Sequence, residues 1–198
     1  MSESIYAPPK ADVEVPEIES EDFYVVSPTK FYLLSFLTLN LYYVYWFYRN
    51  WRAVKAREGS DIWPVPRAIF FIFFTHSLFS AVDDVLKEKQ LEYKWLPAGV
   101  ATLFVSLAIC SSILDRMANK GIGSPTTDVI GTALVLITPL LLVQGQKAMN
   151  FACGDPDGSG NSRYTLANWV WMILGGLFWL LILFGVYALV FAPELLLE

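Results

Sequence analysis

His76 is the only histidine among 198 residues, so any imidazole chemistry of this chain depends on it. On a helix its side chain would share a face with Ser80 and Asp83, because residues three and four apart are neighbours on a helical surface. This spacing is compatible with a proton relay or with half of a metal site. A metal site needs more ligands than these, so we interpret His76 as a structural residue held by hydrogen bonds within a helix cluster.

A second candidate for chemistry is the segment 155–161, in which Asp155 and Asp157 are placed as at the start of an EF-hand calcium loop. Position twelve of such a loop requires a bidentate glutamate and is Leu166 here, while position eight is Ser162 instead of an aliphatic residue. We therefore predict a polar loop and no metal site.

Other catalytic patterns are missing from the sequence. It contains no Gly-rich phosphate loop after a strand, no His-Glu-x-x-His pair and no Gly-x-Ser-x-Gly elbow. The three most apolar segments, residues 96–114, 129–146 and 164–193, carry no charged residue. Charged residues inside a membrane usually mark transport paths, so their lack argues against ion-coupled transport. We predict a non-enzymatic protein with no catalytic residue, no metal and no cofactor.

The most distinctive segment, residues 41–57, is rich in aromatic and basic side chains. Aromatic residues with a polar tip lie at the depth of lipid headgroups, where basic neighbours meet anionic phosphates. One interpretation is recognition of anionic lipid or of membrane curvature, and the other is an aromatic belt followed by a cytoplasmic stop signal. The predicted lipid-interface residues are Tyr45, Trp46, Tyr48, Arg49, Trp51, Arg52, Lys55 and Arg57.

The elements that position these residues are apolar runs. Residues 164–193 contain no charged side chain over 30 positions, whereas a bilayer core requires roughly 20 apolar residues. Four shorter charge-free runs cover residues 31–48, 68–82, 96–114 and 129–146. We predict an all-α, polytopic helical membrane protein in which the last three runs span the bilayer. The first two are expected to be interfacial, re-entrant or spanning helices.

Small residues indicate where the predicted helices meet. Within lipid, small side chains let helix backbones approach closely, either within one chain or between copies. Small residues recur at every fourth position in the run 96–114, and glycines occur in the run 164–193. The predicted helix-packing residues are Ala98, Thr102, Ser106, Cys110, Gly175, Gly176 and Gly185.

The net charge of −5 comes from the N-terminus, where residues 1–22 carry seven acids against Lys10 alone. We predict a disordered acidic tail over residues 1–22 and one helical membrane domain over residues 23–198. With three spans, 12 Lys and Arg residues lie on one side and only Arg116 and Lys120 on the other. This bias predicts a cytoplasmic N-terminus, and a four-span chain with a 10-to-4 split is the alternative.

Four segments of the first half of the chain form one pattern: residues 23–31 (Phe-Tyr-Val-Val-Ser-Pro-Thr-Lys-Phe), 38–40 (Thr-Leu-Asn), 45–51 (Tyr-Trp-Phe-Tyr-Arg-Asn-Trp) and 66–70 (Pro-Arg-Ala-Ile-Phe). This pattern resembles a family of small uncharacterised bacterial inner-membrane proteins, a domain of unknown function, with a looser likeness at 161–165 and Asn168. Such proteins often have Gly where this chain has Asn40. Because Asn also accepts a left-handed backbone, this exchange favours a break between two helices. The resemblance implies a bacterial inner-membrane location and no catalytic residues.

Three functional hypotheses follow from these patterns. The first is a non-enzymatic scaffold, anchor or modulator of a membrane partner. The second is a small oligomeric channel or transporter, with Thr102, Ser106, Thr138, Pro139 and Gln144 as pore groups. The third is a lipid-modifying enzyme with His76 as its base. The expected partners are membrane lipids, anionic by preference, and another membrane protein or further copies of this chain, but no nucleic acid.

Overall fold

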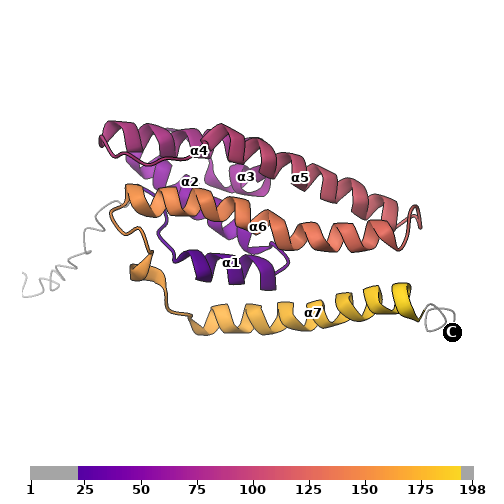
Figure 1. The fold of residues 1–198 in the computed structure, drawn as a ribbon. Helices are drawn as coiled ribbons and strands as arrows, with labels where there is room; N and C mark the ends of the chain where they lie inside the picture. Colours follow the sequence, from indigo (N-terminus) through magenta and orange to yellow (C-terminus); the bar gives the residue numbers. More distant parts are fainter. Residues whose placement is uncertain (1–21, 193–198) are drawn as a thin grey trace, which may run out of the picture.

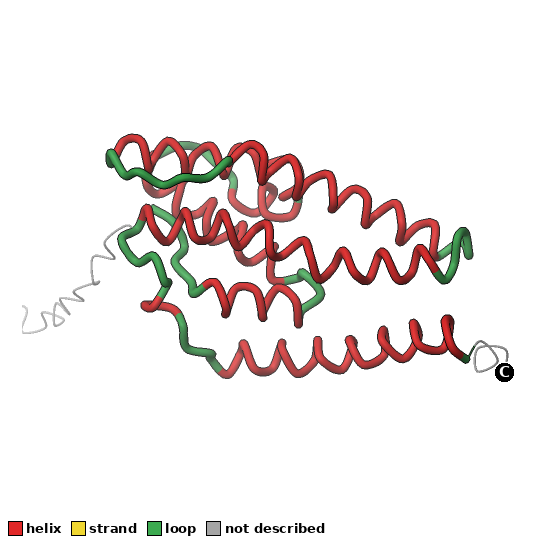
Figure 2. Tube along the Cα trace, viewed as in Figure 1, coloured by secondary structure: helices red, strands yellow, loops and turns green. Residues whose placement is uncertain are grey.

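The computed structural model describes residues 22–192, which form seven α-helices and one short 3-10 helix and contain no strand (Figure 2). The predicted all-α fold is confirmed. The predicted acidic tail lies, except for Asp22, outside the described residues. The elements are α1 (Pro28–Leu37), α2 (Tyr42–Glu58), α3 (Pro64–Ile69), α4 (Phe71–Glu88), α5 (Pro97–Ala118), α6 (Thr126–Ala152), η1 (Ser159–Asn161) and α7 (Leu166–Phe191).

Three helices are long and apolar enough to cross a membrane, namely α5, α6 and α7 with 22, 27 and 26 residues. At 1.5 Å per residue they measure about 33 to 40 Å, which matches or exceeds the thickness of a bilayer core. They correspond to the three predicted spans, so the chain is a membrane protein. In Figure 1, α5 lies beside α6, and α1 lies between α6 and α7.

The first apolar run forms a helical hairpin instead of one continuous span. Helix α1 ends at Leu37 and α2 begins at Tyr42, while Leu39 and Asn40 between them take left-handed φ values of 52° and 67°. The predicted break at Asn40 is confirmed. Thr38 closes the turn, because its hydroxyl donates to the Leu34 carbonyl at 2.6 Å and accepts from the Tyr42 amide at 3.1 Å. A helix of 10 residues such as α1 is too short to span a bilayer.

Helices α1 to α4, together with the start of α5 and the end of α6, form what we call the helical body. Its core is made largely of aromatic rings. The ring centroids of Phe31 and Trp46 lie 5.2 Å apart, and those of Phe47 and Phe71 also lie 5.2 Å apart. Such pairs contribute roughly 0.5–1.5 kcal/mol beyond the burial of their surface. The body is therefore a well-packed unit joined to one end of α6.

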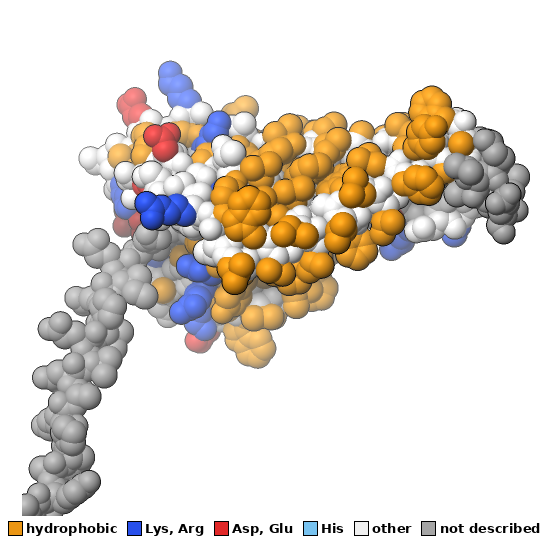
Figure 3. Space-filling view, turned by 90° about the horizontal axis from the view of Figure 1, so that it is seen from below, with side chains coloured by type: hydrophobic (Ala, Val, Ile, Leu, Met, Phe, Trp, Pro, Cys, Tyr) orange, Lys and Arg blue, Asp and Glu red, His pale blue; other side chains and the backbone are white. Residues whose placement is uncertain are grey.

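Helix α7 is attached to the body much more sparsely. A Cβ atom at Gly175 would lie 1.6 Å from the carbonyl oxygen of Leu37, so only glycine allows this approach to α1. Four residues later, the Trp179 indole donates to the Phe36 carbonyl at 2.8 Å. Beyond Trp179 large apolar side chains face outward, among them Leu180, Leu181, Phe184 and Phe191. Figure 3 shows one face of the molecule, with most of its charges gathered at one end and apolar side chains along the remainder.

Candidate functional site

The site with the most specific geometry surrounds residues 22–27, a non-helical segment that we call the strap. Phe23 and Val26 of the strap are buried, so its main-chain groups need partners within the protein. The amide N–H of Tyr24 donates to Asn50 Oδ1 at 3.0 Å, and Gln146 Nε2 donates to the carbonyl of Tyr24 at 3.0 Å. Side chains of α2 and α6 thus take the place of a neighbouring strand.

Asn150 repeats this arrangement two residues further along the strap. Its Oδ1 accepts from the Val26 amide at 3.3 Å and its Nδ2 donates to the Val26 carbonyl at 2.9 Å. Gln146 joins the network, donating to Asn150 Oδ1 at 2.6 Å and accepting from the Trp46 indole. Asn50, Gln146 and Asn150 are all fully buried. Each buried polar group left unpaired would cost about 1–3 kcal/mol, so these side chains define one position for the strap.

The loop between α6 and α7 secures the strap from a third direction. Asn161 donates through Nδ2 to the Val25 carbonyl at 3.0 Å, and its own carbonyl accepts from the Ser27 amide at 3.4 Å. Gly158 has a φ of +64° and lies so close that an added Cβ would be 2.5 Å from the carbonyl of Val26. A side chain at this position would push the loop away from the strap.

Asp155 organises this loop. Its carboxylate accepts from the amides of Gly160 at 2.9 Å and Ser159 at 3.0 Å, and these bonds hold the pKa of Asp155 below its usual value. The carboxylate of Asp155, which resembles the first ligand of an EF-hand, therefore accepts hydrogen bonds from its own loop. Within residues 22–192, no cluster of three or more His, Cys, Asp or Glu side chains is arranged to hold a metal ion.

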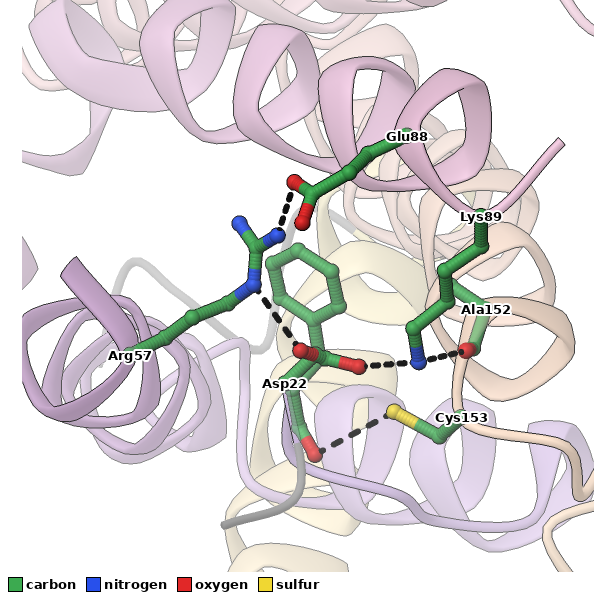
Figure 4. Close-up of polar contacts among 7 residues, drawn as sticks. Asp22, Arg57, Glu88, Lys89, Ala152 and Cys153 are labelled. Atoms are coloured by element: carbon green, nitrogen blue, oxygen red, sulfur yellow. Dashed lines mark hydrogen bonds and ion pairs between the residues drawn. The ribbon is translucent and has the colours of Figure 1, made fainter.

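The start of the strap lies where helices α2, α4 and α6 end (Figure 4). Asp22 pairs with Arg57 of α2 at 2.9 Å and with Lys89 after α4, while Arg57 also pairs with Glu88. Lys89 Nζ donates in addition to the carbonyl of Ala152 at 2.9 Å, where a cation favours the C-terminal dipole of α6. This ion-pair cluster fixes the start of the strap on the body.

The predicted lipid-interface residues separate onto different faces of α2. Trp46 and Trp51 are buried in the core of the body, whereas Tyr45, Arg52 and Lys55 are exposed. Tyr48, Arg49 and Arg57 are half-buried. The physical reason is helical periodicity: large rings on one face of α2 fill the space between α1, α3 and α4, so only the other face remains available to lipid.

The predicted helix-packing residues also have different surroundings. Gly175 contacts α1, whereas Cβ atoms added at Gly176 and Gly185 would meet nothing within 4 Å. The stripe on α5 faces outward, and α5 buries Ala101 and Phe104 in its place. The exposed stripe residues are Ala98, Thr102, Ser106 and Cys110. Apart from the contact of Thr102 with His76 of α4, a packing role of this stripe would need a second chain, and so would a pore lined by Thr102, Ser106 and the exposed Gln144.

His76 is exposed, and its Nε2 lies 3.0 Å from Thr102 Oγ1 of α5, so its contact joins α4 to α5. Asp83, whose spacing makes it a candidate relay partner for His76, pairs with Lys87 at 2.6 Å. The interpretation of His76 as a structural residue stays a prediction.

Sequence reasoning missed the three buried amides that secure the strap. The available signal was the occurrence of Gln146 and Asn150 four residues apart at the end of an apolar run, where polar side chains need partners. Segments 23–31, 45–51 and 161–165, which carry the family resemblance, meet in this site through the strap, Asn50 and Asn161. Comparison with protein-family profiles, curated proteins and solved structures gives no match. Membership of that family stays a prediction.

Proposed function

We propose that this protein is a non-enzymatic membrane scaffold that holds its N-terminal segment at one face of the bilayer for a basic protein partner. The observation that carries this proposal is the fastening of the strap. The main chain of residues 24–26 is held by amide side chains from α2, α6 and the α6–α7 loop, and Asp22 is held by two cations. A segment that only connected two parts of the chain would not need so many directed hydrogen bonds and ion pairs.

The chemistry of the partner follows from charge. Of the seven acids in residues 1–22, Asp22 is paired within the body, which leaves six against Lys10. A segment of this composition attracts Lys- and Arg-rich surfaces, and the attraction weakens as salt rises. The 12-to-2 distribution of Lys and Arg supports a cytoplasmic position for this segment. Within the proposal, the membrane is the bacterial inner membrane that the resemblance implies.

Site-specific crosslinking in native membranes tests this proposal. A photocrosslinker at position 10 is introduced into the full chain and into a variant in which the six acids among residues 1–21 are changed to Gln or Asn. A third chain keeps all charges but has the order of residues 2–21 shuffled. We expect one protein adduct with the wild type and the shuffled chain, reduced at high salt and lost on neutralisation. An equal adduct with the neutralised chain, or none with any chain, contradicts the proposal.

A further inference from the structure

A groove of about 770 Å³ lies between the α1–α2 hairpin and the first turns of α7. Its volume is within the range of small-molecule binding sites. It is lined by Lys30 and Leu34 of α1, by Thr38 after α1, by Tyr42, Tyr45 and Arg49 of α2, and by Trp171 of α7. None of the described residues that line the groove is acidic, although two of them are cations.

Lys30 is the first of these cations and is buried, with 3% of its surface exposed. Its ammonium donates to Asn161 Oδ1 at 2.7 Å and to the carbonyl of Arg163 at 2.6 Å. Both acceptors are neutral, so they do not balance the charge, and burial lowers the pKa of Lys30. An ammonium has three protons to donate, so one is left for a ligand. An anion at this position would offset the cost of burying the charge.

Arg49 is the second cation, and it is held in place by aromatic residues. Its guanidinium lies 4.5 Å from the ring centroid of Tyr24 and donates to the Tyr45 hydroxyl at 2.8 Å. No carboxylate among the described residues forms an ion pair with it. A guanidinium fixed against rings retains free N–H groups in a planar fork, which suits the oxygens of a phosphate.

The two cations lie at the same end of the groove. Lys30 precedes Thr38 by eight residues on α1 and Arg49 follows Tyr42 by seven on α2, so both are about 11–12 Å from the hairpin turn. The capping residues Thr165 and Asn168, where α7 begins, line the groove as well. Towards the turn the lining becomes apolar, with Leu34, Leu41 and Trp171. The polar end is thus at the level where α7 starts, and the apolar end is deeper along the spanning helix.

We propose that this groove binds one anionic glycerophospholipid, with the phosphate between Lys30 and Arg49 and one acyl chain extending towards the hairpin turn. Charge complementarity selects an anionic headgroup, and the polar-to-apolar direction of the groove is that of a lipid in the bilayer. Basic pockets between helices at a membrane surface bind lipid headgroups in this way. The tyrosine hydroxyls supply further hydrogen bonds to the phosphate oxygens.

Native mass spectrometry of the full chain in mild detergent tests the site, using titration with phosphatidylglycerol and separately with phosphatidylcholine. Arg49→Gln is the principal variant because Arg49 is half-buried and its contact with the strap is to the ring of Tyr24, not to the main-chain groups that the buried amides hold. Lys30→Met is the second variant. Lys147→Gln is the matched control, since it removes the same charge from an exposed position on α6 outside the groove.

We expect one phosphatidylglycerol to be retained per chain in preference to phosphatidylcholine. Arg49→Gln should weaken its binding about fivefold, whereas Lys147→Gln should change it less than about twofold. Lys30→Met should weaken binding further wherever that variant remains folded by circular dichroism. Equal retention of the two lipids overturns the proposal, as does an equal effect of Arg49→Gln and Lys147→Gln. If the site binds soluble glycerol 3-phosphate to saturation but retains no phosphatidylglycerol, it is a site for a soluble phosphate and the proposal is overturned.

Discussion

The strap and α7 are both held against α1 or its neighbours, but by different physical means. The strap is positioned by polar groups that each have one geometrically suitable partner, such as the paired contacts between Asn150 and Val26. Helix α7 is positioned by a close approach at Gly175 and by the contact of Trp179 with Phe36. Buried polar groups are costly in any alternative position, whereas lipid tails are as apolar as leucine and drive little association of helices. The strap should therefore be rigid, and α7 should be free to exchange neighbours.

Replacing Asn150 with Leu should produce the largest loss of stability. The change orphans the amide and the carbonyl of Val26 and removes an acceptor of Gln146, at a cost of about 3 kcal/mol or more. Reversible unfolding in mixed micelles measures this loss. Gln144→Leu on the same helix is the control, because Gln144 is exposed and should change stability by less than about 0.5 kcal/mol. Equal losses of stability in Asn150→Leu and Gln144→Leu would contradict the claim that the buried amides hold the strap.

Gly175→Ala should detach α7 without unfolding the body. The added methyl group meets the Leu37 carbonyl, and overpacking of this kind costs about 1–3 kcal/mol. Gly176→Ala has open space and should be neutral or stabilising by up to about 1 kcal/mol, since alanine favours helix. Spin labels at the exposed positions 52 and 184 report the separation of α7 from the body. A broader distance distribution is expected for Gly175→Ala alone, and an unchanged one would contradict the contact.

Asp22→Asn should have a smaller, salt-dependent effect at the start of the strap. It removes the pairing of Asp22 with Arg57 and Lys89, and such partly exposed pairs contribute about 0–1 kcal/mol each. The loss of stability should be measurable by thermal unfolding at low ionic strength and should fade towards 1 M salt. Asp157→Asn, at an exposed position, controls for the change in net charge. A loss that is unaltered by salt would show that Asp22 acts by something other than its ion pairs.

The smallest expected effect is a pH dependence of the loop that supports the strap. The folded pKa of Asp155 lies below its unfolded value of about 3.9. Stabilisation by the carboxylate is therefore fully present above the unfolded pKa and is lost as the pH falls through the folded pKa. Amide exchange at Ser159 and Gly160 should accelerate in acid beyond the intrinsic trend. Asp155→Asn should abolish this pH-dependent component, and its persistence in the variant would assign it to another group.

The sequence predicted those parts of the fold that depend on local composition. Long charge-free runs identified α5 to α7, and Asn40 indicated the break in the first run, because both signals act within a few residues. The site depends on contacts between residues 100 or more positions apart, such as Trp46 with Gln146, which no local pattern contains. The aromatic residues of α2 were ambiguous for a physical reason: a ring such as that of Trp51 suits both a lipid interface and a protein core.

Hydrogen exchange at the amides of Tyr24 and Val26 in the full-length protein tests the central claim most directly. The side chains of Asn50 and Asn150 accept from these two main-chain N–H groups, as a neighbouring strand would do in a sheet. Both N–H groups should therefore exchange about a thousandfold or more slowly than unprotected ones. Val26 should lose this protection in Asn150→Leu, while the amides of α4 retain theirs. Exchange of Tyr24 and Val26 at unprotected rates in the wild type would contradict the account, because the strap would then not be fixed at the membrane face.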